Sequence, residues 1–319
     1  MSQDVFLGVD VGSVSTNIAV LDKDLKILDT LYIRTKGNPM ESVKEALKIT
    51  GEKLPKDVEV KAACTTGSAR NLTKAMIGAD IAKTEITAHA VAASHFMPDV
   101  HTILEIGGQD SKVILMEKGI VTDFAMNTVC AAGTGAFLDH QARRLNIRIE
   151  DFGGIAIQAR ARVNIAGRCT VFAESDMIHK QQTGHPMSEI LRGLCDAMVR
   201  NYLNNICKGK KLLAPVMFQG GVAANQGMRA AFEEALEMPV TIPEHYGEMG
   251  AIGCAILAKE EYEKKGMKTT FLGFEISQFE YTSSSFECSG CSNQCEVIQV
   301  FMNGKMIARW GGRCGKWEA

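Results

Sequence analysis

The sequence has no hydrophobic run that approaches the roughly 20 residues a membrane-spanning helix needs. It also lacks an excess of one charge: 35 Lys and Arg residues stand against 37 Asp and Glu residues, for a formal net charge of -2. This balance gives no reason to expect a nucleic acid or a membrane surface as partner. The first residues show neither the basic lead nor the hydrophobic core of an export signal. We therefore expect a cytoplasmic protein that binds neither nucleic acid nor membrane.

The chain contains ten cysteines, and without an export signal we do not expect them to form disulfides, because the cytosol keeps thiols reduced. Four lie in apolar or helical segments and are predicted to be small core residues: Cys64, Cys195, Cys207 and Cys254. The other six lie in segments with Gly, Ser or Arg and are candidates for metal chemistry: Cys130, Cys169, Cys288, Cys291, Cys295 and Cys314.

A short apolar run near the N-terminus, residues 5–10, ends on the carboxylate of Asp10. A turn follows, and residues 17–21 and 26–33 continue as two further strands, which predicts a three-strand meander. Backbone amides and hydroxyls at such a tip can bind phosphates, while the carboxylate can hold Mg²⁺. The predicted ligands are Gly12, Ser13, Ser15, Thr16 and, for the metal, Asp10. Taken alone, the same pattern also fits a plain hairpin.

The pattern occurs a second time. Residues 101–107 form an apolar run in which Glu105 aligns with Asp10 and Gly107 with Gly12. Such a duplication predicts two similar lobes that each direct a glycine hairpin at a shared cleft. The candidate site residues of the second copy are Glu105, Gly107, Gly108, Gln109, Asp110 and Lys112.

A buried strand over residues 214–219 leads into a Gly-Gly junction before the next helix. Glycine lets a flat, neutral adenine and ribose lie against the backbone, although a tight packing turn gives the same pattern. The predicted adenosine-binding residues are Gly220, Gly221, Val222 and Asn225.

Cys130 and Cys169 each precede a segment that is predicted to be helical. In the first segment the small residues Gly133, Thr134 and Gly135 allow a large group to approach the backbone, and a helix start suits an anion. A thiolate-ligated iron–sulfur cluster is an anion, and two cysteines are half of what a 4Fe-4S cluster needs. A second copy of the chain across a two-fold axis would supply the other half, which predicts a homodimer.

Six motifs in order then resemble a known family: DVGSVST, EIGGQDSK, CAAGTGAFLD, RCTVFAESD, FQGGVAANQGM and YGEMGAIGCAILA. Over roughly residues 4–263 the chain resembles the ATP-dependent activators of 2-hydroxyacyl-CoA dehydratases. The ATPase subunits of benzoyl-CoA reductase and the reductase of double-cubane cluster proteins are close relatives of these. The resemblance implies an actin/hexokinase/Hsp70-type α/β fold, with ATP or ADP between two ribonuclease-H-like lobes. It also implies a homodimer that shares one 4Fe-4S cluster through Cys130 and Cys169 of each subunit.

The resemblance assigns DVGSVST and EIGGQDSK to phosphate binding, FQGGVAANQ to adenosine, and CAAGTG to a hinge that is also a cluster ligand. Glu105 departs from the Asp usual in the family, which moves the carboxylate by about one C–C bond. Its role toward Mg²⁺ or water is therefore open, and Gln109 and Asp110 can share it. We expect residues 1–98 to form lobe I with 243–265 packing back on it, and 99–242 to form lobe II.

Residues 266–319 lie past the resemblance and contain Cys288, Cys291, Cys295 and Cys314. Predicted strands over 297–302 and 305–310, joined by Asn-Gly, form a hairpin between the third and fourth cysteines. Four thiolates at this spacing predict a metal module that holds either Zn²⁺ or a second 4Fe-4S cluster. Unligated thiols in a flexible tail are the simpler alternative.

The predicted function is an iron–sulfur ATPase that uses ATP to deliver one electron at low potential to a partner iron–sulfur enzyme. That partner would be a dehydratase, a benzoyl-CoA-type reductase or a double-cubane protein, and a ferredoxin or flavodoxin would reload the cluster. A small-molecule kinase of the same fold is the alternative, because fold alone does not decide function. An Hsp70-like interaction module is a third possibility. The cysteine pair at helix starts favours the electron donor.

Overall fold

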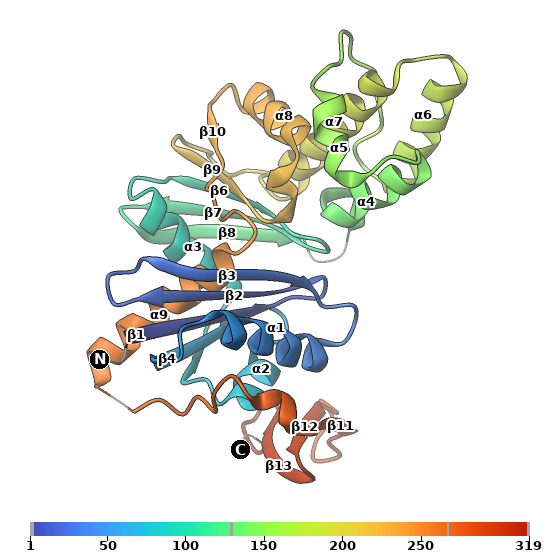
Figure 1. Ribbon diagram of the computed structural model, residues 1–319. Helices are drawn as coiled ribbons and strands as arrows, with labels where there is room; N and C mark the ends of the chain where they lie inside the picture. Colours follow the sequence, from blue (N-terminus) through green and yellow to red (C-terminus); the bar gives the residue numbers. More distant parts are fainter. Residues whose placement is uncertain (1–2, 128–129, 267, 318–319) are drawn as a thin grey trace. The chain divides into compact units, whose positions relative to one another are not determined.

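The computed structural model describes residues 3–127, 130–266 and 268–317 (Figure 1). The chain divides into two compact units: unit 1 comprises Met1–Ala88 and Gly250–Ala319, and unit 2 comprises His89–Met249. The boundaries expected from the sequence were 98 and 243, so residues 89–98 and 243–249, which were expected in lobe I, belong to unit 2. Residues 266–319 lie in unit 1 with the N-terminal segment.

The sheet of unit 1 has the strand order β3-β2-β1-β4-β5. Its strands are β1 (Gln3–Val11), β2 (Ser15–Asp22), β3 (Ile27–Arg34), β4 (Val58–Thr66) and β5 (Ile81–Ala82). The first three strands pair antiparallel as the predicted meander, and β4 pairs parallel with β1. The apolar run of β1 is buried on both faces from Val5 to Val9, which explains why it reads as a continuous hydrophobic segment.

The sheet of unit 2 has the equivalent order, β8-β7-β6-β9-β10. Its strands are β6 (Thr102–Ile106), β7 (Ser111–Glu117), β8 (Ile120–Asn127), β9 (Val216–Gln219) and β10 (Val240–Thr241). Again three strands form an antiparallel meander, and the fourth pairs parallel with the first. The two sheets therefore confirm the duplication expected from the sequence and extend it by two strands.

The helices of unit 1 are α1 (Pro39–Lys53), α2 (Arg70–Ile77) and α9 (Met249–Lys265), with the first residues of α3 (Glu85–Phe96). Helix α1 begins where the Asn38 side chain accepts the Glu41 amide at 3.2 Å, with a proline in its first turn. Helix α9 lies close against β1, because a Cβ added at Gly8 would come within 1.8 Å of the Ala251 carbonyl oxygen.

The described part of unit 2 contains five further α-helices: α4 (Gly135–Arg144), α5 (Ile149–Ala156), α6 (Thr170–Gln182), α7 (Met187–Asn205) and α8 (Gln226–Leu236). Helix α7 is the centre of their core, where Tyr202 packs edge-on against Phe232, which also meets Phe218. The four cysteines predicted to be core residues are all buried, two in each unit. Burial raises the pKa of Cys195 well above its ordinary value and that of Cys207 to about 12.

Residues 268–317 form an extension that packs on unit 1 (Figure 1). It contains a short 3-10 helix, η3 (Ile276–Gln278), and the three-stranded antiparallel sheet β11 (Tyr281–Glu287), β12 (Glu296–Met302) and β13 (Lys305–Trp310). The predicted β12–β13 hairpin is confirmed, whereas the sequence did not predict β11. The Tyr281 hydroxyl donates to the Met76 carbonyl of α2 at 2.8 Å, and Asp80 accepts hydrogen bonds from Thr269 and Thr270.

Candidate functional site

The first candidate hairpin lies at the end of β1 in unit 1. The Gly12 amide donates to the Ser15 carbonyl at 2.9 Å, which closes the turn that contains Ser13. Asp10 lies beside this turn, against the start of α9: a Cβ added at Gly250 would come within 2.2 Å of Asp10 Oδ2. The structure therefore brings Asp10, Gly12, Ser13 and Ser15 together, as the phosphate-binding prediction requires.

Thr16 is placed differently from the other predicted ligands of this hairpin. Its side chain is fully buried, and its hydroxyl lies 3.1 Å from the Thr35 hydroxyl and 2.8 Å from that of Ser42, which is on α1. The hydroxyl is thus used to join β2 to α1. Any contribution of Thr16 to phosphate binding would come from its backbone.

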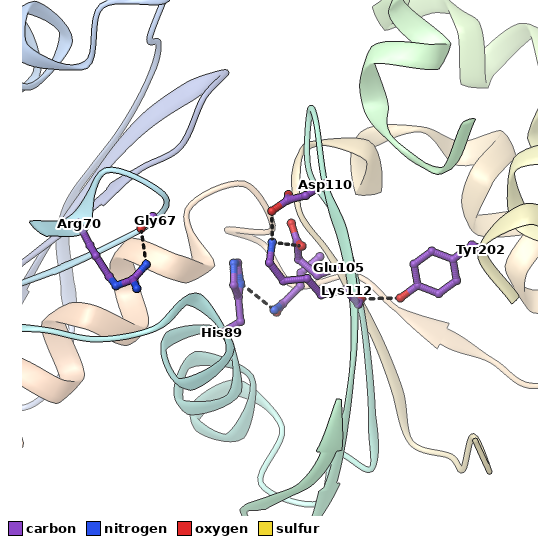
Figure 2. Close-up of polar contacts among 8 residues, drawn as sticks. Gly67, Arg70, His89, Glu105, Asp110, Lys112 and Tyr202 are labelled. Carbon is purple, nitrogen blue, oxygen red and sulfur yellow. Dashed lines mark hydrogen bonds and ion pairs between the residues drawn. The ribbon is translucent and has the colours of Figure 1, made fainter. Parts of the chain in front are cut away.

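The second candidate hairpin, in unit 2, contains a buried ionic cluster (Figure 2). The Lys112 ammonium lies 3.0 Å from Glu105 Oε2 and 2.8 Å from Asp110 Oδ2, with the Lys112 side chain 2% exposed. The Tyr202 hydroxyl donates to the Lys112 carbonyl at 2.5 Å, and burial raises the pKa of this phenol well above its ordinary value. The sequence predicted that the Lys112 ammonium binds phosphate. In the structure, this ammonium forms ion pairs with both carboxylates and compensates their charge.

The two units match residue by residue around these carboxylates. Asp10 pairs with Asn17 on β2 and Thr66 on β4, while Glu105 pairs with Lys112 on β7 and Gln219 on β9. A charged ammonium therefore stands at a position that the first copy fills with a neutral amide.

A glycine with positive φ follows β4 and β9 at the same place: Gly67 at +90° and Gly220 at +87°. An added Cβ would lie 2.7 Å from Asp10 Oδ1 at the first and 2.8 Å from Glu105 Oε1 at the second. No role was predicted for Gly67 from the sequence. If the predicted repeat had included the fourth strand of each sheet, β4 and β9, Gly67 would have aligned with Gly220.

The predicted adenosine motif forms a short 3-10 helix, η2 (Gly221–Ala224), that leads into α8. Gly221 faces open space, since nothing lies within 4 Å of an added Cβ. The Asn225 side-chain oxygen caps α8 by accepting the Met228 amide at 3.1 Å, which leaves its amide nitrogen without a hydrogen-bond partner among the described residues. Val222 is buried at 8% exposure. The open glycine fits the predicted contact with a nucleoside, whereas the Asn225 amide nitrogen is buried.

One buried polar contact near this strand was not anticipated. Gln219 on β9 lies with its side-chain nitrogen 3.0 Å from His89 Nδ1 on α3, and both side chains are buried. Gln219 is the strand partner of Glu105, so this contact ties α3 to β9, the strand next to the one that bears the carboxylate. No local pattern indicates it, since the two residues are 130 positions apart.

Cys130 and Cys169 occupy the residue just before a helix, as predicted. Cys130 precedes the 3-10 helix η1 (Ala131–Gly133), which leads into α4, and Cys169 precedes α6. Neither thiol makes a capping hydrogen bond, and Cys130 is exposed while Cys169 is half-buried. Val171 and Phe172 beside Cys169 are 66% and 64% exposed. An exposed thiol at Cys130, and a half-buried one at Cys169 that is followed by an exposed apolar pair, fit a metal cluster at a subunit contact, although the ligand role stays a prediction.

The four cysteines of the extension lie at one end of its three-stranded sheet. Cys288 follows β11, Cys295 precedes β12 and Cys314 follows β13, with Cys291 in the intervening loop. The Trp317 indole N–H at 3.1 Å and the Gly290 amide at 3.4 Å donate to the Cys288 sulfur, and these contacts lower the pKa of its thiol. Donation to sulfur is a feature of thiolate ligands.

In the described ranges, no three His, Cys, Asp or Glu side chains lie close enough together to hold a metal ion. The four cysteines of the extension therefore share one end of the sheet, but their thiols do not form a ligand set. The prediction that residues 266–319 form a metal module is not confirmed. Over the same residues, no helix is long and apolar enough to cross a membrane.

The duplicated sheets and their glycine hairpins define an α/β ATPase of the actin/hexokinase type, and solved structures agree. The activator of the 2-hydroxyisocaproyl-CoA dehydratase from Clostridium difficile, solved with bound ADPNP, matches with a TM-score of 0.74 at 29% identity, over 83% of this chain and 98% of that one. A ROK family glucokinase from Streptomyces griseus matches at 0.50 with 13% identity, over 80% and 99% of the two chains. At this identity the second match shows the fold alone.

The chain belongs to the BadF/BadG/BcrA/BcrD ATPase family, whose model matches residues 7–258. It is 33% identical to the (R)-2-hydroxyglutaryl-CoA dehydratase activating ATPase of Acidaminococcus fermentans over 261 residues. The aligned region covers 81% of this chain and 98% of that relative. The family expected from the six motifs is thereby confirmed. The extension that contains the second cysteine set lies past the family match.

Proposed function

We propose that this protein is a homodimeric ATPase that couples ATP hydrolysis to one-electron delivery to a partner iron–sulfur enzyme. The observation that carries the proposal is that unit 2 combines the second candidate hairpin with an exposed and a half-buried cysteine, each just before a helix. A small-molecule kinase has no use for such a pair. The relatives that are named as dehydratase activators support the same assignment.

In this proposal the two hairpins bind the phosphates through backbone amides, and Asp10 holds Mg²⁺ or its water. Glu105 and Asp110 lie beside the second hairpin, where Gln109 completes the set that can orient water for hydrolysis. Lys112 holds both of these carboxylates in place through its two ion pairs. The Gly220–Gly221 junction receives the adenosine, and Asn225 caps the helix α8 that follows it.

Cys130 and Cys169, with the same residues of a second copy, would hold a 4Fe-4S cluster that accepts and releases a single electron. The exposed Val171–Phe172 pair would be covered when the two copies meet. The partner enzyme would be a 2-hydroxyacyl-CoA dehydratase or a related reductase, and a ferredoxin or flavodoxin would supply the electron.

The extension is proposed to bind its own metal through Cys288, Cys291, Cys295 and Cys314. Support comes from the gathering of all four residues at one end of the sheet and from the two N–H donors to the Cys288 sulfur. The residues leave Zn²⁺ and a second 4Fe-4S cluster open, and elemental analysis decides between them.

The test is anaerobic purification of the full chain and of four variants, with iron, zinc and acid-labile sulfide measured per dimer. Cys130→Ala and Cys169→Ala should each remove the shared cluster while Cys291→Ala and Cys314→Ala, the matched controls, should leave it in place. The controls should instead lose the metal of the extension. If Cys130→Ala retains the wild-type iron and sulfide content, the electron-donor function is wrong and an iron-free ATPase or kinase takes its place.

A further inference from the structure

A polar junction lies under Gly133, in the segment that joins Cys130 to α4. It consists of Ser111 from β7, Asn127 from β8 and Asn201 from α7. A Cβ added at Gly133 would come within 3.1 Å of Asn201 Oδ1, 3.3 Å of Asn127 Nδ2 and 3.7 Å of Ser111 Oγ. Three elements of unit 2 therefore converge on the cysteine-bearing segment through side chains that can form hydrogen bonds.

Asn127 holds the backbone of Cys130 from both sides. Its side-chain oxygen accepts the Cys130 amide at 2.9 Å, and its side-chain nitrogen donates to the Cys130 carbonyl at 2.7 Å. Asn127 is also the strand partner of Ser111, the residue that ends the second phosphate hairpin. Asn127 thus lies between the candidate nucleotide hairpin and the candidate cluster ligand Cys130, and it contacts both.

The same hairpin contacts the start of α4 through the backbone. The Gly135 amide donates to the Gly107 carbonyl at 2.9 Å, and the Ala136 amide donates to the Gly108 carbonyl at 2.8 Å. Gly107 and Gly108 form the tip that is expected to bind phosphate. Any shift of this tip on nucleotide binding is therefore transmitted through these two hydrogen bonds to the segment after Cys130.

Asn201 joins the two cysteine-bearing segments. Its side-chain nitrogen donates to the Gly167 carbonyl at 2.6 Å, two residues before Cys169, while its oxygen lies under Gly133. Asn201 is 3% exposed, and within the described part of the chain neither its Oδ1 nor Ser111 Oγ has a hydrogen-bond partner. Buried polar atoms without partners are costly, so an arrangement that pairs them is favoured.

We infer that Asn127 and Asn201 are positioning residues that transmit the nucleotide state of the second hairpin to the two cysteines. Asn127 links the hairpin to Cys130, and Asn201 links the Cys130 segment to the Cys169 segment. This inference rests on the proposed function, because it describes how the ATP site acts on the proposed cluster site. Nucleotide binding would change the arrangement of the polar junction of Ser111, Asn127 and Asn201, and the junction would pass this change on to the cysteines.

The experiment measures thiol alkylation in the reduced, metal-free full chain, with and without ADPNP, by mass spectrometry of the Cys130 and Cys169 peptides. In the wild type, the nucleotide should change the Cys130 rate at least about fivefold, the lower range of allosteric coupling. Cys291 in the extension serves as internal reference and should not respond. Asn127→Ala should remove the nucleotide response of Cys130, with the ADPNP affinity within about twofold of wild type.

Asn127→Asp keeps the oxygen that accepts the Cys130 amide and should restore part of the response. A merely structural role would instead raise the Cys130 rate equally with and without nucleotide. Asn201→Ala should remove the response of Cys169 while leaving that of Cys130.

A second pair of variants keeps the test informative if the asparagine variants do not fold. An alanine at Gly135 places its Cβ 3.0 Å from the Gly107 carbonyl oxygen, whereas nothing lies within 4 Å of one at Gly154 on α5. Gly135→Ala should therefore reduce the response and Gly154→Ala should not.

The inference is overturned if the nucleotide does not change Cys130 alkylation in the wild type, or if the response persists in Asn127→Ala. These outcomes are separable from failure of the proposed function. Absence of iron from anaerobically prepared protein would refute the cluster, while bound iron without a nucleotide response would refute only the junction.

Discussion

Replacing Lys112 with methionine tests the ionic cluster of the second hairpin. The ammonium is 2% exposed and lies within 3.0 Å of Glu105 Oε2 and 2.8 Å of Asp110 Oδ2. Methionine keeps much of the apolar stem but removes the charge, and Glu105 stays 3% exposed. Removing one partner of a buried ion pair leaves a buried charge uncompensated, so we expect a loss of about 3–5 kcal/mol in the free energy of unfolding.

The assay is urea unfolding followed by far-UV circular dichroism, with hydrogen exchange of the β6–β7 hairpin to assign the loss to unit 2. Arg229→Met is the matched control, because its pair with Glu233 on α8 is 49% and 34% exposed and should contribute at most about 1 kcal/mol. The double variant Lys112→Met with Glu105→Gln should recover a large part of the loss, because the buried charge is removed with its partner. A loss no larger than that of the control, or a double variant less stable than Lys112→Met, would refute the reasoning.

Three further predictions concern catalysis, docking of the extension and thiol chemistry. Asp10→Ala should slow ATP hydrolysis at least about a hundredfold without loosening the dimer, and a wild-type turnover rate would show that the first hairpin is not the phosphate loop. Tyr281→Phe removes the donor to the Met76 carbonyl and should lower the free energy of unfolding of unit 1 by about 0.5–1.5 kcal/mol; an unchanged urea midpoint would contradict this. In metal-free protein at about pH 8, iodoacetamide should modify exposed Cys130 while Cys207, with its pKa raised by burial to about 12, stays protonated and unmodified, which peptide mass spectrometry checks.

Local patterns in the sequence were sufficient for the duplicated meanders. Each apolar run that ends on a carboxylate became a strand followed by a turn, because the alternation of apolar runs and Gly/Ser turns is a property of neighbouring residues. The placement of Cys130 and Cys169 just before helices was likewise predictable. The four cysteines in apolar segments were recognised as core residues for the same reason.

Short strands and side-chain partners depended on tertiary structure. Strand β5 has two residues and the exposed serines of β11 show no buried face, so pairing with β4 and β12 alone makes them strands. The sequence predicted the Thr16 hydroxyl as a phosphate ligand, yet it forms hydrogen bonds with Thr35 and Ser42, which lie 19 and 26 positions away.

The sequence by itself determined the repeated sheets, the glycine hairpins and the six motifs of the family, because these depend on order and spacing along the chain. The tertiary structure decided which side chains meet: Lys112 with two carboxylates, Gln219 with His89, and Asn201 with the segment before Cys169. Hydrogen bonds and ion pairs form wherever packing brings donors and acceptors together, and the Gln219–His89 pair is 130 residues apart in the chain. Spacing along the sequence cannot specify such a contact, since it exists only once β9 and α3 have packed.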